Sequence, residues 1–230
     1  MSHLTPEIKS SMEKIFEAAD ISYLFMDKNG GICCGRPTLL TGQKDAAQKL
    51  MQKNKGIIEQ SGAKILVTSC PICYKMFNEE YQLNIPVLHH TQYINQLITK
   101  KQLNIQSTDT KVVFHDPCDL GRNSGVYNEP REILSKIAQL QPTPFDKEKG
   151  LCCGGSLGNT EMTYNQRKLV SFDAVKKLTE QKPDILVTAC PLCKKTFADT
   201  NHVQVKDISQ LVIEAVMCKQ KQNEVIVDSN

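Results

Sequence analysis

A nine-residue stretch occurs twice in this 230-residue chain, and this repeat is the feature that most constrains its fold. Residues 65–73 read ILVTSCPIC and residues 185–193 read ILVTACPLC, so the copies differ by two conservative exchanges at a spacing of 120 residues. An adjacent cysteine pair followed by glycine precedes each copy, as Cys33-Cys34-Gly35 and as Cys152-Cys153-Gly154. Because such a compound pattern does not recur by chance, we interpret the chain as an internal duplication.

Each copy of the repeat is expected to alternate helices and strands, judged from apolar periodicity and from capping residues. The first copy predicts helix 6–19, strand 21–26, helix 43–60, strand 64–68, helix 73–80, strand 87–89 and helix 92–100. The second copy predicts strand 111–115, helix 131–140, helix 164–180, strand 184–188 and helix 208–218. This alternation predicts an α/β fold with two pseudo-symmetric, Rossmann-like halves, whose mostly parallel sheets are flanked by helices. A polar stretch at 102–110 predicts a division into a first half, 1–105, and a second half, 106–230.

The cysteines of each half are candidate metal ligands because of where they follow the strands. Cys70 and Cys190 come directly after an apolar strand and open a helix, which is where parallel sheets place their ligand sites. A helix N-terminus lowers the pKa of a thiol and offers N–H groups to sulfur. The candidate ligands are Cys33, Cys34, Cys70 and Cys73 in the first half and Cys118, Cys152, Cys153, Cys190 and Cys193 in the second. Several thiolates that converge from different loops are typical of iron–sulfur clusters.

Other interpretations of these cysteines stay open at this point. Four thiolates with this spacing also suit a structural zinc ion, although the fifth cysteine of the second half exceeds what tetrahedral zinc needs. In the first half, four cysteines fit zinc, an iron–sulfur cluster or a damaged site. A thioredoxin-like interpretation of the C-x-x-C segments leaves both adjacent cysteine pairs unexplained. The run Gly154-Gly155-Ser156 lacks the lysine of a phosphate-binding loop, and close approach of the backbone to a cluster explains it better.

Three histidines and an aspartate near the cysteines are candidates for supporting roles around the ligands or in the fold. His115 and Asp116 precede Cys118, where they are able to hydrogen-bond a ligand sulfur and tune its potential, although capping of the turn is an equal role for Asp116. His89 and His90 end a strand, and we expect a surface or a structural role for them rather than metal ligation.

The composition limits the classes of binding partner and the cellular compartment that we expect for this protein. The chain has 28 Lys and Arg against 25 Asp and Glu, a net charge of +3 without a basic block, so we expect neither nucleic acid nor an anionic membrane as partner. No apolar stretch is long enough to span a bilayer and no secretory signal opens the chain, so we expect a cytoplasmic protein. In a reducing compartment, ten cysteines indicate metal or redox chemistry rather than disulfides. Cys218 falls on the apolar face of the last predicted helix and is expected to be a core residue.

The arrangement of the cysteines also resembles a known family. The second half contains one cysteine, then Cys-Cys-Gly, then C-x-x-C, each about thirty-odd residues apart. The first of these cysteines is preceded by His115-Asp116-Pro117 and is soon followed by Leu120-Gly121-Arg122. This pattern is similar to the CCG, or cysteine-rich, domain found in the B-type subunit of heterodisulfide reductase and in the catalytic part of its D-type subunit. The iron–sulfur subunits of anaerobic glycerol-3-phosphate dehydrogenase and of lactate and glycolate oxidation systems are similar as well. The first-half runs CCGRP, from Cys33, and LTGQ, from Leu40, resemble the D-type subunit.

The resemblance implies an oxidoreductase role and a cofactor. In the family, the five-cysteine motif carries a noncubane [4Fe-4S] cluster, and two such clusters flank the place where a disulfide is reduced. It implies a [4Fe-4S] cluster of this type in the second half, and iron–sulfur or zinc in the first half. The implied function is an iron–sulfur redox subunit that takes electrons from a flavoprotein or a ferredoxin-like iron–sulfur subunit and reduces a disulfide or passes the electrons on. A partner of this kind also allows membrane association.

Two alternative functions stay open, and the sequence differs from the family pattern at two positions. The alternatives are an electron-transfer subunit of a glycerol-3-phosphate, lactate or glycolate dehydrogenase complex, and a zinc-binding scaffold without redox activity. The first repeat lacks its leading cysteine, because Cys118 projects back to the position of Met1 or just before it. Either the chain is a piece of a longer protein or the first site works with four cysteines. Asp119 stands where the family has histidine, so the proton-donating role of that histidine is not transferred.

Overall fold

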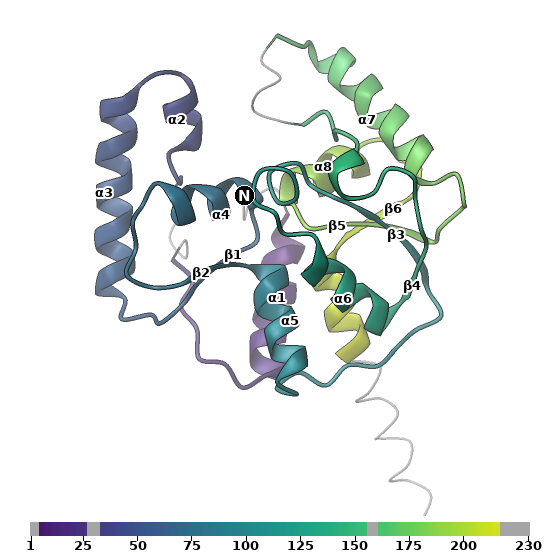
Figure 1. Ribbon diagram of the computed structural model, residues 1–230, viewed down its shortest axis with the longest axis horizontal. Coiled ribbons are helices and arrows are strands. Elements are labelled where there is room, and N and C mark those ends of the chain that lie inside the picture. Colours follow the sequence, from purple (N-terminus) through teal and green to yellow (C-terminus); the bar gives the residue numbers. More distant parts are fainter. Residues whose placement is uncertain (1–4, 27–32, 156–160, 217–230) are drawn as a thin grey trace, which may run out of the picture.

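The computed structural model describes residues 5–26, 33–155 and 161–216, and Figure 1 shows their arrangement. The helices are α1 (Pro6–Ala18), α2 (Arg36–Leu40), α3 (Lys44–Gln60), α4 (Pro71–Glu79), α5 (His90–Thr99), α6 (Asn128–Ile137), α7 (Tyr164–Leu178) and α8 (Pro191–Ala198), with a 3₁₀ turn at Lys147–Lys149. The strands are β1 (Leu66–Thr68), β2 (Val87–His89), β3 (Lys111–His115), β4 (Gln139–Leu140), β5 (Ile185–Thr188) and β6 (Gln204–Asp207). Residues 208–216 are helical as well.

Every strand pair among the described residues is parallel, which confirms the predicted α/β class. The second half contains a four-stranded sheet in the order β4-β3-β5-β6, and the first half contains the pair β1-β2. In the larger sheet, Val112 to His115 of β3 pair with Ile185 to Thr188 of β5. The unit strand, helix, strand, helix that runs from β1 to α5 recurs from β5 to the helix at 208–216, as the internal repeat predicts.

Helices cover both faces of the four-stranded sheet, because successive side chains of a strand point to opposite faces. Figure 1 shows α7 and α8 on one side of this sheet and α6 on the other. Val113 and Leu186 pack with the residues of α7 and α8, whereas Val112 and Phe114 belong to a core that includes α6. The same core contains apolar residues of α1 and α5, so the two halves share one continuous apolar interior.

Most predicted elements are confirmed with shifted ends. Strand 111–115 has the predicted bounds, and the helices observed at the predicted ranges 6–19, 43–60, 73–80, 92–100 and 164–180 differ from them by a few residues at an end. The helix predicted over 208–218 is helical to residue 216, and its remainder, with Cys218, lies outside the described residues. Among the described residues, no helix is both long and apolar enough to cross a membrane.

Two predictions of secondary structure are wrong at least in part, and strand β6 was missed. The helix predicted over 131–140 ends at Ile137, because Gln139 and Leu140 pair with β3 and form β4. Strand β6 was not predicted, since its sequence QVKD is polar and only Val205 in it has a high β-propensity. The segment 21–26, predicted as a strand, belongs to none. Its Tyr23 packs against Phe16 with 5.1 Å between ring centroids, and no described strand lies beside it to accept its backbone bonds.

Candidate metal centre

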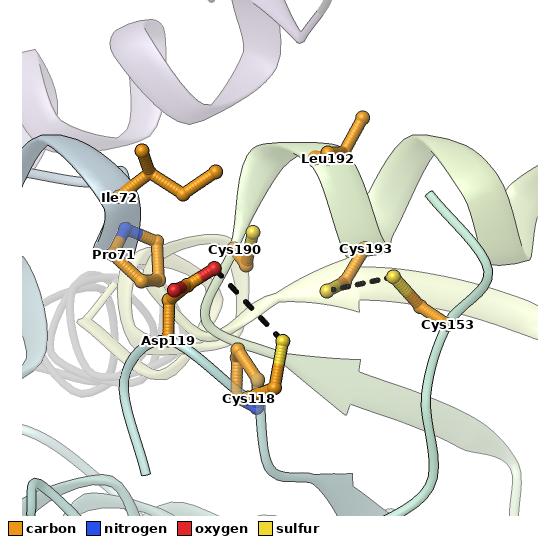
Figure 2. Close-up of a pocket in the computed structure, with 9 residues that line it drawn as sticks. Pro71, Ile72, Cys118, Asp119, Cys153, Cys190, Leu192 and Cys193 are labelled. Atoms are coloured by element: carbon orange, nitrogen blue, oxygen red, sulfur yellow. Dashed lines mark hydrogen bonds between the residues drawn. The ribbon is translucent and has the colours of Figure 1, made fainter. Parts of the chain in front are cut away.

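Four cysteines of the second half line one pocket. Cys118 follows β3, Cys153 lies in the loop before α7, and Cys190 and Cys193 open α8, so the thiols come from three separate segments (Figure 2). Cys152, the fifth predicted ligand, is exposed in the same loop as Cys153 and does not line the pocket. The pocket is completed by Pro71, Ile72, Pro117, Asp119 and Leu192. The site thus lies beyond the carboxyl ends of the parallel strands, as predicted from the sequence.

The start of α8 holds two of these thiols because of its capping sequence. Cys190 is the N-cap residue in an extended conformation, and Pro191 occupies the first turn, where a missing N–H costs nothing. The Cys190 carbonyl accepts the N–H of Lys194 at 2.9 Å, which closes the first helical turn around Cys193. The positive end of the helix therefore faces both sulfur atoms.

Backbone N–H groups of the glycines donate to the adjacent cysteine pair. Gly154 N–H donates to Cys152 Sγ at 3.4 Å, and Gly155 N–H donates to Cys153 Sγ at the same distance. Cys193 Sγ donates to Cys153 Sγ at 3.2 Å. This bond lowers the pKa of Cys153 and raises that of Cys193 well above its ordinary value. One proton is therefore held between two buried sulfurs, and a cation that binds both must displace it.

Cys118 is held in its protonated form by its surroundings. Burial, and next the negative charge of Asp119, raise the pKa of Cys118 to about 11. The Asp119 carboxylate lies 3.9 Å from Cys118 Sγ, at the position where the resemblance would place a histidine. A cation in the pocket would reverse this preference, because the thiolate is then the favoured ligand.

Gly154 is required by its conformation and by a close backbone approach. Its φ is +79°, and an added Cβ would lie 2.5 Å from the carbonyl oxygen of Arg167 in α7. Gly125 has a similar φ of +70° with open space around it. We expect Gly154→Ala to destabilise the protein by more than the roughly 1–2 kcal/mol of left-handed strain that Gly125→Ala costs, and to lower iron uptake. Urea unfolding and iron content of both variants check this, and equal effects would contradict the backbone clash.

The first half brings three of its four predicted cysteines together. Hydrogen bonds from the Cys73 thiol lower the pKa of Cys34 to about 7 and that of Cys70 as well, while they raise the pKa of Cys73. Cys70 is the N-cap of α4, just as Cys190 is of α8. Cys33 is exposed, although its sulfur accepts the N–H of Gly35 at 3.5 Å.

The two cysteine sites are neighbours across the repeat. Ile72 and Leu192 occupy the same position in the two nine-residue copies, and both line the second-half pocket. Both also line a larger cavity of about 1100 Å³, and all four first-half cysteines line this cavity as well. Figure 2 shows Pro71 and Ile72 of α4 on one side of the pocket, facing Cys118 and Asp119. Two apolar side chains therefore lie between the sites.

His115 and Asp116 hold the cysteine loop rather than a sulfur atom. His115 Nε2 donates to the carbonyl of Leu151 at 2.9 Å, which fixes the residue before Cys152, and its Nδ1 lies 3.1 Å from Thr188 Oγ1. The buried Asp116 accepts two hydrogen bonds from Arg131, at 2.9 and 2.6 Å. The roles of Arg131 and Leu151 were not predicted, because both contacts join residues that are distant along the chain.

We expect the buried state of His115 to make stability depend on pH. Burial lowers the pKa of His115 to about 4, whereas an unfolded histidine titrates near 6.5. Between these values the unfolded chain binds a proton that the folded chain does not, so the free energy of unfolding falls as the pH is lowered, by roughly 3 kcal/mol at most. Urea unfolding of the metal-free protein from pH 7 to pH 4 should show this slope. His115→Gln should make this slope less steep, while the contribution of the buried His89 stays, and an unchanged slope would contradict the assignment.

His89 and His90 are structural, and the surface alternative is wrong. Both side chains are 0% exposed. His90 Nε2 lies 3.1 Å from Asp207 Oδ1, which joins the two halves, and His89 Nδ1 lies 2.8 Å from Thr91 Oγ1. Burial lowers the pKa of His89 well below its ordinary value.

The donor set fits an iron–sulfur group. Within the described residues, no group of three or more His, Cys, Asp and Glu side chains is arranged to hold a single metal ion. The pocket instead presents soft thiols from separate segments, backbone N–H groups aimed at sulfur, and glycine where a side chain would collide. Soft thiolates with N–H donors around them are the surroundings that iron–sulfur clusters require.

Comparison with known proteins gives one family and several relatives. The family described as "Cysteine-rich domain" (CCG) matches residues 1–78 and 112–198. The D-type subunit of the heterodisulfide reductase of Methanosarcina barkeri is 31% identical over 201 residues, which cover 80% of this chain and 49% of that protein. A probable iron-sulfur-binding oxidoreductase of Bacillus subtilis is 28% identical over 92% of this chain and 32% of its own length. This chain therefore spans half or less of the length of these relatives.

Two further proteins are similar at lower identity. The B-type subunit of the fumarate reductase (CoM/CoB) of Methanothermobacter marburgensis is 27% identical over 80% of this chain and 38% of its own length. Among solved structures, a putative Asp/Glu racemase from Yersinia pestis matches 93% of this chain and 94% of that chain, with 16% identity and a TM-score of 0.38. A likeness at that level says nothing about function.

Proposed function

We propose that this chain, which belongs to the cysteine-rich (CCG) domain family, is an iron–sulfur redox subunit of a larger oxidoreductase. The observation that carries the proposal is the convergence of Cys118, Cys153, Cys190 and Cys193 on one pocket at the strand ends. The names of the relatives support it, since they include a heterodisulfide reductase and an iron-sulfur-binding oxidoreductase.

A [4Fe-4S] cluster of the noncubane type is proposed for the second half. The buried Cys153, Cys190 and Cys193 and the half-buried Cys118 would hold it, with Cys152 as the fifth ligand once the exposed side chain turns inward. The group would supply one-electron chemistry when bound. The N–H groups of Gly154 and Gly155 would stabilise the sulfur charge, and His115 would fix the loop through Leu151. The first half, with Cys33, Cys34, Cys70 and Cys73, would hold a second iron–sulfur group or zinc.

The reaction we favour is that of a heterodisulfide reductase. Electrons would come from a flavoprotein or an iron–sulfur partner, because the sequence contains no flavin or nucleotide fingerprint. The 31% identity to the D-type subunit of a heterodisulfide reductase supports a disulfide as the acceptor. A relative named EtfAB:quinone oxidoreductase, 27% identical, supports the alternative that this subunit passes electrons onward in a dehydrogenase complex.

Metal analysis of the anaerobically purified protein tests the proposal. We expect about four irons and a matching amount of acid-labile sulfide for the second site, together with broad visible absorption and a paramagnetic resonance signal in one redox state. A zinc scaffold would be colourless and would contain zinc without sulfide. That result, obtained after anaerobic reconstitution with iron and sulfide as well, would overturn the proposal.

A further inference from the structure

Two buried polar side chains hold the adjacent cysteine pair of the first half by its backbone. Asn54 of α3 and Tyr81, which follows α4, are each 3% exposed. Asn54 Nδ2 donates to the Cys33 carbonyl at 2.8 Å, and the Tyr81 hydroxyl donates to the Cys34 carbonyl at 3.0 Å. Asn54 Nδ2 also donates to the Tyr81 hydroxyl oxygen at 2.9 Å. The Asn54–Tyr81 pair therefore binds two consecutive carbonyls of the cysteine loop as one connected unit.

The orientation of the Asn54 amide follows from its two partners. One partner is the carbonyl oxygen of Cys33, and the other is the Tyr81 hydroxyl, whose own proton is donated to Cys34. Both partners accept, so only the NH₂ end of the amide suits them. The other end, Oδ1, is buried and has no hydrogen-bond partner among the described residues. A buried amide oxygen without a partner costs free energy, which indicates that Asn54 serves more than stability.

The Tyr81 hydroxyl sets the direction of a backbone N–H group. In a trans peptide the carbonyl and the N–H point in opposite directions. The Cys34 carbonyl accepts the Tyr81 hydroxyl, so the N–H of Gly35, in the same peptide, faces away from Tyr81. This N–H donates to Cys33 Sγ at 3.5 Å. Tyr81 thus acts on a ligand sulfur through the peptide between them.

Asn54 holds the preceding peptide in the same way. The Cys33 carbonyl accepts the Asn54 amide, so the N–H of Cys34 points to the opposite side. The Cys73 thiol contributes most to the lowered pKa of Cys34, and the N–H groups of Arg36 and of Cys34 itself lower it further, against the effect of burial. Both peptides that the pair holds therefore direct an N–H group toward a cysteine sulfur.

The second half holds its cysteine pair by other means. Helices α3 and α7 begin 120 residues apart, and this offset places Ala174 at the position of Asn54. An alanine side chain has no donor. The second-half loop is instead held by His115, which donates to the carbonyl of Leu151. The Asn54–Tyr81 pair is therefore a feature of the first site and not a general requirement of the repeat.

We propose that Asn54 and Tyr81 are positioning residues of the first-half site. They aim two backbone N–H groups at the cysteine sulfurs and so raise the reduction potential of the iron–sulfur group held there. This inference rests on the proposed function, because it requires iron in the first half. Hydrogen bonds to sulfur stabilise the reduced group more than the oxidised one, since the reduced group carries more negative charge.

Tyr81→Phe is the variant that tests this role. It removes only the hydroxyl and keeps the ring beside Phe77, whose centroid lies 4.6 Å away. In protein with Cys153→Ala, the iron is that of the first half, and a redox titration followed by paramagnetic resonance gives its midpoint potential. We expect a more negative potential, a changed resonance spectrum and faster hydrogen exchange at the Gly35 amide. Asn54→Ala, which removes both of its donor contacts, should shift the potential further in the same direction.

Tyr74→Phe is the matched control. Tyr74 lies in α4, and its hydroxyl is hydrogen-bonded to Gln92 of α5 instead of the cysteine loop. Its loss should leave the potential and the Gly35 exchange unchanged. Urea unfolding of the metal-free variants measures stability separately, because a merely structural Tyr81 would lower stability without moving the potential.

Three outcomes would overturn the proposal. The first is an unchanged potential in both Tyr81→Phe and Asn54→Ala, and the second is an equal shift in Tyr74→Phe. The third is a first half that binds no iron after anaerobic reconstitution. In that third case the proposed function stands, since the unmodified protein would still contain iron and sulfide at the second site. Failure of the proposed function is a different result, because iron would then be missing from both halves.

Discussion

Replacing Cys153 with alanine is expected to remove nearly all iron and sulfide from the second-half site. Cys153 is buried, lies 3.2 Å from Cys193 Sγ and accepts the Gly155 N–H. The neighbouring thiol, Cys152, is already proposed as the fifth ligand, so we expect that it does not replace the lost one. Iron and acid-labile sulfide per chain, with the resonance spectrum, measure the effect. Circular dichroism of the metal-free variant separates loss of the ligand from loss of the fold.

Cys218→Ala is the matched control for this prediction. Cys218 belongs to neither set of candidate ligands, so its loss should leave the iron content unchanged. A Cys153→Ala protein that kept its full iron content and spectrum would contradict the assignment of Cys153. If the site holds zinc instead, the same substitution lowers the zinc content and the stability of a colourless protein.

The parts of the site that follow from local sequence could be predicted. Strand 111–115 is a short run of β-branched and aromatic residues, and Cys190 comes just after a second such run. Because the carboxyl ends of parallel strands meet at one edge, the sequence was enough to expect Cys118 and Cys190 at one place. The exposure of Cys152 was not predictable, since the loop before α7 is held by the distant His115, which donates to the carbonyl of Leu151.

The parts that depend on distant partners could not be predicted. Gln139 and Leu140 continue the apolar periodicity of α6, and only the backbone of β3 turns them into a strand. The segment 21–26 shows the opposite case. Its residues favour a strand, yet strand formation requires a neighbouring backbone, and none of the described strands lies beside it. A segment with strand-forming residues therefore became a strand only where the sheet offered a neighbouring strand to pair with.

Removing the charge of Arg131 is expected to destabilise the folded protein by about 3–5 kcal/mol, because a buried carboxylate is left without its cation. Asp116 is buried, and it accepts both Arg131 bonds and the backbone N–H of Lys147 at 2.9 Å. Methionine at 131 retains the packing over the Phe114 ring, whose centroid lies 5.3 Å from the guanidinium carbon. Urea unfolding of metal-free Arg131→Met at neutral pH measures the loss. Since Lys147 begins the turn before the cysteine loop, iron uptake at the second site should fall as well.

Asp146→Asn separates the buried part of this interaction from its exposed part. Asp146 also pairs with Arg131, but its side chain is 46% exposed, so its loss should cost no more than about 1 kcal/mol. In the double variant Asp116→Leu with Arg131→Met, no charge remains buried, and part of the lost stability should return. If Arg131→Met and Asp146→Asn cost the same, the buried Asp116 pair does not hold the loop. The position of Cys153 must then be set by His115 and the two glycines alone.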